Sequence, residues 1–302
     1  MKPVGTYLLK IFFFPLSKLP LRVHYWLSGG LAWLAGSLVR YRKSDVLINL
    51  SRAFPEKNYQ EIKTLCKEFY RHFADIFAEA VWFGGCRNPE RLRRANIMEV
   101  VNPEVLDGFA AGDKSIMVMY SHCGNWEIFG GIESYFPKGR SPFTEQNFCV
   151  VYKKMSSAAW DAFFRDNRFA PLHDRRNFGG YLESKNVVRY ILEHRSEKKC
   201  YNVNTDQRPY YEGSDSIEVS FLGQRCRTMS ASAALARKFA MPVYFLRMDI
   251  VSRGHYRLEY LPLCEDASAL SVQEIMDKYY ALLEAEIREQ PANYLWSHRR
   301  WK

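Results

Sequence analysis

The sequence lacks the signatures of several common classes of functional site. It has no Gly-rich phosphate loop, no His-Glu-x-x-His zinc pattern and no Cys-x-x-Cys pair. It also has no internal repeat or low-complexity tract, and no stretch resembles a nucleic-acid-binding module. We therefore expect a chain that needs neither a metal nor a cofactor and has no nucleic-acid partner.

Cysteine is present without a pattern. The seven residues are scattered along the chain and odd in number, which argues against a disulfide framework. This usage fits reduced thiols that face a cytoplasm. The cysteines are Cys66, Cys86, Cys123, Cys149, Cys200, Cys226 and Cys264.

No hydrophobic run is long enough to cross a bilayer by itself. The run Leu8–Phe14 stops at Pro15, and the uncharged run 25–39 is shorter than the ~20 residues that a spanning helix needs. No small-residue cleavage site follows a clean apolar core, so we expect no removed signal peptide. We interpret residues 1–40 as a membrane anchor or interfacial helices. The alternative is a core helix packed on the domain.

Aromatic residues within this segment and basic residues at its end agree with a membrane-associated interpretation. Tyr25, Trp26 and Trp33 suit the headgroup level of a bilayer. Arg40 and Arg42 follow directly, and the positive-inside bias then places the rest of the chain in the cytoplasm.

Acidic residues are fewer than basic ones. The chain of 302 residues has 33 acidic and 43 basic side chains, with a formal charge of +10. This balance favours a phosphorylated ligand, an acidic carrier protein or an anionic membrane surface as a partner. Residues 87–94 hold four arginines, which indicate either a solvated helix end or a contact with a carrier protein or phosphate. The length is sufficient for one large domain.

The most informative stretch is Ser121–Gly131, which reads SHCGNWEIFGG. It follows the apolar run 115–120, which predicts a buried strand. Asn125 is a plausible N-cap for the apolar helix face that begins at Ile128. The pattern therefore places His122 in a strand-to-helix turn and Glu127 in the first turn of the helix.

This turn decides whether His122 and Glu127 can meet. Residues five apart in one continuous helix point roughly 140° away from each other. A turn at Cys123-Gly124 instead lets His122 fold back onto the Glu127 carboxylate, which would fix its tautomer and leave a general base. The alternatives are a buried, satisfied histidine beside an ordinary first-turn acid, or a nucleophile at Cys123.

Two further strands are predicted to end in polar residues. The segment 147–152 ends at Lys153, and the segment 200–205 ends at Asp206 and Gln207. Ligands bind at the carboxyl ends of strands in open α/β sheets. Asp206 and Gln207 could orient a substrate hydroxyl or fix Lys153, or Asp206 could merely cap the loop. Periodicity predicts helices at 59–83, 158–168, 231–239 and 272–288, and strands at 217–223, 242–251 and 257–261.

The string SHCGNWEIFGG closely resembles the signature of the late (secondary) lipid A acyltransferases of the lauroyl/myristoyl type. The resemblance extends over residues 42–302, including Asp206-Gln207 and the ending YLWSHRRWK. In that family a His, four residues and then Asp or Glu form the catalytic dyad, which implies His122 and Glu127. Lys153 stands where the family usually has an active-site arginine, and Arg168 matches a second family arginine.

The resemblance implies a glycerol-3-phosphate-acyltransferase-like α/β fold, with a central, mostly parallel sheet flanked by helices over residues 41–302. The implied reaction moves a fatty acyl chain from acyl carrier protein to a hydroxyl of a lipid A precursor, on the cytoplasmic face of a bacterial inner membrane. Turn amides near Gly124 and Asn125, with Lys153, would hold the oxyanion. Other envelope glycolipids or aminolipids, a thioesterase and a non-catalytic lipid-binding membrane protein remain as alternatives.

Overall fold

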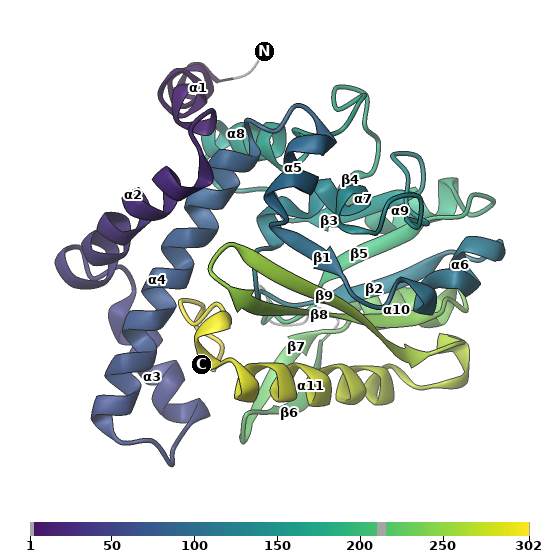
Figure 1. The fold of residues 1–302 in the computed structure, drawn as a ribbon. Helices are drawn as coiled ribbons and strands as arrows, with labels where there is room; N and C mark the ends of the chain where they lie inside the picture. The colour runs from purple at the N-terminus through teal and green to yellow at the C-terminus, as the bar shows by residue number, and fades with distance from the viewer. Residues whose placement is uncertain (1–2, 210–215, 302) are drawn as a thin grey trace.

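The main sheet is mostly parallel, as the sequence predicts. The computed structural model describes residues 3–209 and 216–301, and within them seven strands have the order β1-β9-β8-β2-β5-β3-β4 (Figure 1). β8, β2, β5, β3 and β4 are mutually parallel, whereas β9 runs antiparallel to β8 and parallel to β1. The strands are β1 (Met98–Val100), β2 (Ile116–Tyr120), β3 (Phe148–Tyr152), β4 (Tyr181–Glu183), β5 (Cys200–Asn204), β8 (Val243–Ser252) and β9 (His255–Cys264).

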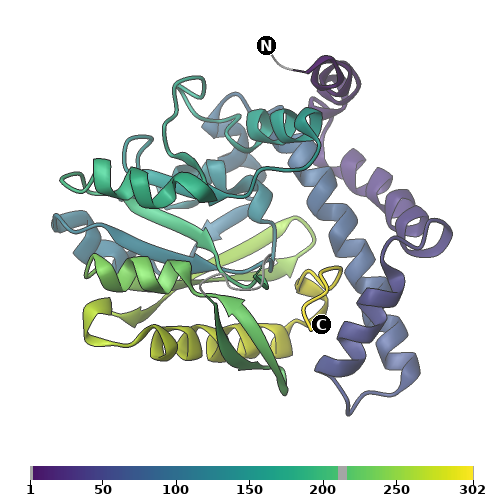
Figure 2. The same ribbon diagram turned by 180° about the vertical axis from the view of Figure 1, so that it is seen from behind.

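Helices cover both faces of this sheet, and the central strand β2 shows why. All five of its residues are buried. Met117 and Met119 point into one hydrophobic core, while Ile116 and Val118 point into the other, as the two-residue period of a strand requires. The first core is closed by α9 (Val187–Glu193), α10 (Ala231–Lys238) and α11 (Val272–Glu289), seen in Figure 2. The second is closed by α5 (Pro89–Ala95), α6 (Asp107–Ala111) and α7 (Ile132–Tyr135).

A long helix, α4, stands at the edge where β2 ends. It spans Tyr59–Phe83, the range that the apolar periodicity predicts. Asn58 caps it and forms a capping box with Glu61. Asn125, just beyond β2, donates to the Ile76 carbonyl of α4 at 3.4 Å. The carboxyl end of β2 therefore faces α4, and α3 (Lys43–Ala53) packs on the same helix.

The N-terminal segment forms helices on the outside of α4. They are α1 (Val4–Ser17), α2 (Leu21–Trp33) and a π-helical turn, η1 (Leu34–Leu38). α1 lies against α8 (Ala158–Arg168), and α2 lies along α4 (Figure 1). The apolar run stops at Pro15, but the helix α1 continues for two more residues. Across residues 3–209 and 216–301, none of the helices combines the length and the apolar character that crossing a membrane requires.

A two-stranded hairpin packs beside α11. Its strands are β6 (Ser216–Phe221) and β7 (Gln224–Met229), joined through Leu222 and Gly223, both with positive φ. Such a two-residue turn matches the twist of the flanking strands. The sequence predicts the first strand but not the second. The remaining short helices are η2 (Pro103–Leu106), η3 (Trp126–Gly131), η4 (Ser184–Asn186), η5 (Ala267–Ala269) and η6 (Pro291–Asn293).

Candidate active site

The turn after β2 is sharp and tightly enclosed. Gly124 adopts a φ of +61°, and a Cβ at this position would lie 2.1 Å from the Met248 sulfur. Only glycine fits such a position without displacing its neighbours. The Asn125 side chain then accepts the Glu127 N–H at 3.1 Å and caps η3. The predicted turn and N-cap are therefore confirmed, although the first turn of the helix is 3₁₀ rather than α.

Asn125 faces the protein interior. Its side chain is fully buried and donates to Glu79 Oε2 at 2.7 Å. The Glu79 carboxylate also accepts the hydroxyls of Tyr25 and Tyr256, each at 2.8 Å. Burial raises the pKa of Glu79 to about 7, against the opposing effect of these hydrogen bonds. In this arrangement Asn125 anchors the turn, so the expectation that it contacts substrate has no support from its geometry.

The carboxylate that holds His122 is Asp206. His122 Nδ1 lies 2.7 Å from Asp206 Oδ1, and the His122 backbone N–H donates to Asp206 Oδ2 at 3.3 Å. Burial raises the pKa of Asp206, but the charge and hydrogen bond of His122 outweigh it, so the net pKa lies below its usual value. Asp206 is only 2% exposed. It follows β5, the strand beside β2, which explains why the two side chains meet.

Glu127 has a different partner from the one that the sequence predicts. Its carboxylate accepts two hydrogen bonds from Arg168, at 2.6 Å from Nε and 2.7 Å from Nη2. Arg168 also donates to the hydroxyl of Tyr181. The guanidinium matches the carboxylate in the bidentate geometry that favours Arg–Glu pairs. The expected contact of Glu127 with His122 is thus replaced by the contacts of Glu127 with Arg168 and of His122 with Asp206.

The second nitrogen of His122 points toward Gln207 and His298. The Gln207 side-chain amide lies 3.1 Å from His122 Nε2 and 3.5 Å from His298 Nε2. An amide N–H donating to Nε2 assigns the proton of a neutral His122 to Nδ1, facing Asp206. This tautomer leaves Nε2 as the proton acceptor, as in a general base. Trp126 packs edge-on against the His122 ring, with centroids 4.8 Å apart.

His298 is a neighbour of the site that the sequence does not single out for chemistry. Its ring lies 5.5 Å from that of His122, centroid to centroid. Burial and the neighbouring His122 lower the pKa of His298 to about 4, so its ring is neutral near pH 7. The ending YLWSHRRWK resembles the family, but the sequence does not indicate that this segment lies beside the end of β2. Lys302, the last residue of that ending, lies outside the described residues.

The predicted oxyanion donors are not gathered at His122. The Gly124 N–H donates to Asn293 Oδ1 at 2.7 Å, and the Asn125 N–H points at the Met248 sulfur at 3.0 Å. Both turn amides are therefore engaged inside the protein. Lys153 is exposed just beyond β3, and β5 separates β3 from β2 in the sheet.

Cys123 is unsuited to a nucleophilic role. It is 1% exposed, and burial raises the pKa of its thiol well above the usual value. A nucleophilic cysteine needs accessible thiolate, which burial in apolar surroundings suppresses. The alternative of a cysteine nucleophile therefore has no support.

An apolar pocket adjoins the motif. It has a volume of about 290 Å³ and is bounded on one side by Trp126 and Glu127. Its walls come from α2, η1, α4 and α8, and they place hydrophobic side chains almost everywhere except at Glu127. These wall residues are Leu31, Ala35, Phe73, Ala74, Ile76, Phe77, Ala80 and Phe164.

A comparison with protein families identifies the family of the chain. Residues 2–302 match the model of the bacterial lipid A biosynthesis acyltransferases. The chain belongs to this family. No curated protein matches the sequence. The match covers almost the whole chain, so membership of the lipid A biosynthesis acyltransferases makes the protein an enzyme that transfers acyl groups.

Proposed function

We propose that the protein transfers a fatty acyl group, of the lauroyl or myristoyl type, from acyl carrier protein to a hydroxyl of a lipid A precursor. The observation that carries this proposal is the His122–Asp206 pair at the end of β2, where Trp126 contacts the His122 ring and also lines an apolar pocket. A proton acceptor next to a space for an acyl chain is the minimum that acyl transfer to an alcohol requires. Family membership supports the same reaction class.

His122 acts as the general base in this mechanism. The acceptor hydroxyl displaces the Gln207 amide from Nε2 and gives its proton to His122, while Asp206 stabilises the imidazolium. The hydroxyl oxygen bonds to the thioester carbonyl carbon and forms a tetrahedral oxyanion. The C–S bond then breaks, and the leaving thiolate takes the proton from His122. The displaced Gln207 amide is close enough to donate to the oxyanion.

The apolar pocket beside Trp126 is the proposed acyl-chain site. It opens at the motif and is lined by aliphatic and aromatic side chains. Burying a methylene group stabilises a complex by about 0.8 kcal/mol, so a chain inserted here gains affinity with each carbon. Glu127 lines this pocket and its carboxylate is held by Arg168, which gives Glu127 a role in shaping the site.

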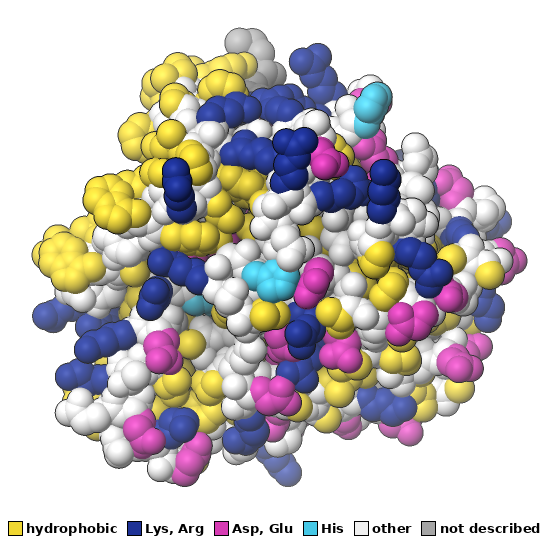
Figure 3. Space-filling model, in the orientation of Figure 1, with side chains coloured by type: hydrophobic (Ala, Val, Ile, Leu, Met, Phe, Trp, Pro, Cys, Tyr) yellow, Lys and Arg dark blue, Asp and Glu magenta, His cyan; other side chains and the backbone are white. Residues whose placement is uncertain are grey.

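We also propose that the outer sides of α1 and α2 rest on the cytoplasmic face of the bacterial inner membrane. Hydrophobic side chains gather there, at the left of Figure 3, next to lysine and arginine side chains. Phe12, Trp26 and Trp33 are 66%, 77% and 63% exposed. Apolar and aromatic residues beside basic ones are typical of helices that lie in the interface of anionic membranes. The basic surface also suits an acidic carrier protein.

The proposed function is tested by following a labelled acyl group. Purified protein is supplied with labelled acyl carrier protein and a membrane-embedded lipid A precursor, and the products are separated. We expect label in the lipid, and His122→Ala should reduce the rate by about 10²–10⁴-fold while the circular dichroism spectrum stays unchanged. Label released as free fatty acid would identify a thioesterase instead. A folded His122→Ala protein with normal turnover would exclude His122 as the base.

A further inference from the structure

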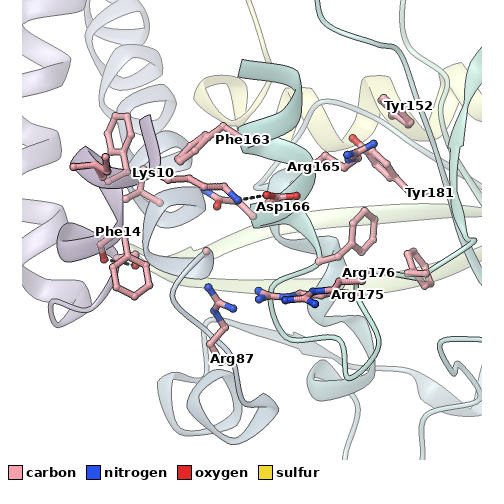
Figure 4. A pocket seen from close by; sticks show the side chains of 18 residues that line it. Lys10, Phe14, Arg87, Tyr152, Phe163, Arg165, Asp166, Arg175, Arg176 and Tyr181 are labelled. Atoms are coloured by element: carbon pink, nitrogen blue, oxygen red, sulfur yellow. Dashed lines mark hydrogen bonds and ion pairs between the residues drawn. The ribbon is translucent and has the colours of Figure 1, made fainter. Parts of the chain in front are cut away.

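A second, larger cavity lies between α1, α8 and the segment that leads to β4. Its volume is about 810 Å³, and its walls combine aromatic and basic side chains (Figure 4). The apolar part includes Phe13 and Phe14 of α1 and Phe163 of α8. Five basic side chains and one acidic side chain also line it, namely Lys10, Arg87, Arg165, Arg175, Arg176 and Asp166.

Three of these arginines face one another in a part of the cavity where positive charges outnumber the negative charge of Asp166. Figure 4 shows the guanidinium groups of Arg87, Arg175 and Arg176 converging on one part of the cavity. The one lining carboxylate, Asp166, forms an ion pair with Lys10. In residues 3–209 and 216–301, none of the three arginines has an ion pair or a side-chain hydrogen bond. Burial and the positive charges of Arg87 and Arg176 lower the pKa of Arg175, although the negative charge of Asp166 acts in the opposite direction. A bound anion would relieve this repulsion.

This cavity adjoins the candidate active site. Tyr181 lines it, and the Tyr181 hydroxyl accepts a hydrogen bond from Arg168. Arg168 in turn holds Glu127, on the rim of the apolar pocket. One ligand could therefore place a charged group in the cavity and another group near His122.

The apolar wall indicates what kind of ligand carries the charge. Ile11 and Phe14 of α1 line the cavity and are also 72% and 51% exposed. The cavity is thus continuous with the apolar surface of α1, and an amphipathic molecule could keep its chains there while its head group enters. Three arginines provide several paired N–H donors, which suit phosphate oxygens.

We propose that this cavity binds a phosphate group of the acyl acceptor, with Arg87, Arg175 and Arg176 as its donors, while the acceptor hydroxyl reaches His122. This inference rests on the proposed acyl transfer, because it locates the phosphate of the acceptor used in that reaction. The phosphodiester of the carrier protein's prosthetic arm offers the same chemistry. The experiment therefore separates the two sources.

Binding without turnover tests the proposal. The probe is a phosphorylated glycolipid whose target hydroxyl is already acylated, compared with the same lipid after phosphatase treatment, both in detergent micelles. We expect the phosphorylated form to bind wild-type protein at least tenfold more tightly. Arg87→Gln and the double variant Arg175→Gln/Arg176→Gln should remove most of this difference. Arg93→Gln, an exposed charge on α5 outside the cavity, should leave the difference unchanged.

Two results would overturn the proposal. One is equal binding of the two lipid forms by wild-type protein. The other concerns binding of carrier protein with and without its prosthetic arm. If the double variant no longer prefers the form with the arm but binds the phosphorylated lipid normally, the arginines bind the carrier protein's phosphodiester instead. This binding experiment involves no acyl transfer, so its outcome is separate from that of the labelled-acyl experiment. A wild-type protein that transfers no acyl group would contradict the proposed function, whatever the result of the binding experiment.

Discussion

At the scale of single residues, the pairing of His122 with Asp206 has a consequence for the pH dependence of activity. Replacing Asp206 by Asn removes the negative charge that holds His122 Nδ1 at 2.7 Å. The imidazolium that forms on proton transfer then loses its counter-charge and is less stable. We expect kcat/KM of Asp206→Asn to drop by about 10²–10⁴-fold and its acid limb to move to lower pH, measured as a pH–rate profile.

Glu127→Gln is the matched comparison, because it also turns a carboxylate into an amide. Glu127 binds Arg168 and not the His122 ring. Activity should fall through the disturbed pocket rim, but the acid limb of kcat/KM should stay where it is in the wild type. The opposite result would be an acid limb of kcat/KM that moves in Glu127→Gln and stays unchanged in Asp206→Asn. In that case Glu127 would be the partner of His122 during catalysis.

Lys153 offers a second test at this scale. The residue is exposed beyond β3, at the same sheet edge as His122 but on the far side of β5. If its ammonium holds an oxyanion or a substrate phosphate, Lys153→Arg should keep substantial activity and Lys153→Met should lose most of it. Both variants are measured on one acyl donor at saturating acceptor. Equal rates would place Lys153 outside the site.

The sequence predicts which residues belong to the site better than it predicts which of them contact one another. The five predicted residues form two polar groups, one of His122 with Asp206 and Gln207 and the other of Glu127 with Arg168. The pairing differs because side-chain direction depends on the closed turn at residues 123–125, where packing against Met248 leaves no freedom. Contacts between residues that are 84 and 41 positions apart cannot be read from local spacing.

At the scale of elements, long periodic segments were predictable and short ones were not. Tyr59–Phe83 and Ala158–Arg168 are helices with the predicted bounds, because each has an apolar stripe of helical period. β7 alternates arginines with buried residues and has little apolar signal, so nothing in the sequence predicts it. α1 continues past Pro15 to Ser17, although a proline beyond the first turn removes one helical hydrogen bond.

The helix α11 contains a buried acid that should shape stability. Glu286 is fully buried and accepts the Met248 N–H at 2.8 Å, and burial raises its pKa to about 8. The folded protein therefore binds a proton that the unfolded chain releases near pH 4.5. Its contribution to stability is complete below that pH and is lost as pH rises toward 8, by up to about 1.4 kcal/mol per pH unit.

Glu286→Gln keeps the shape of the protonated acid and removes this titration. We expect wild type and variant to unfold alike in urea at pH 5, and the variant to be more stable above pH 8. Asp277→Asn, an exposed change of the same charge on α11, should leave the pH dependence as in the wild type. Parallel pH profiles for Glu286→Gln and wild type would show that Glu286 is ionised in the folded protein.

At the scale of the whole molecule, charge and apolar surface are arranged so that one side can meet a membrane. The formal charge is +10, and the N-terminal helices carry exposed aromatic side chains, among them Trp26 and Trp33. The cavity with the three arginines opens beside the same helices. A lipid held in the bilayer could thus reach the site without leaving its apolar surroundings.

Membrane binding through this surface is testable without deleting α1 or α2, which pack on the rest of the fold. The triple variant Phe12→Ser/Trp26→Ser/Trp33→Ser removes exposed aromatic surface and preserves the charge. Losing partly inserted aromatic side chains should weaken partitioning to anionic vesicles by roughly tenfold or more, measured by vesicle flotation.

The matched control is Val188→Ser/Leu192→Ser on α9, whose side chains are 44% and 45% exposed and lie away from α1 and α2. This variant should float with vesicles as the wild type does, because α9 covers the opposite part of the molecule (Figure 2). Added salt should weaken binding of all forms, since basic side chains contribute to it. If the triple variant and the control float equally well, another face of the protein must contact the membrane. An acceptor lipid held in the bilayer would then not reach the site along the surface of α1.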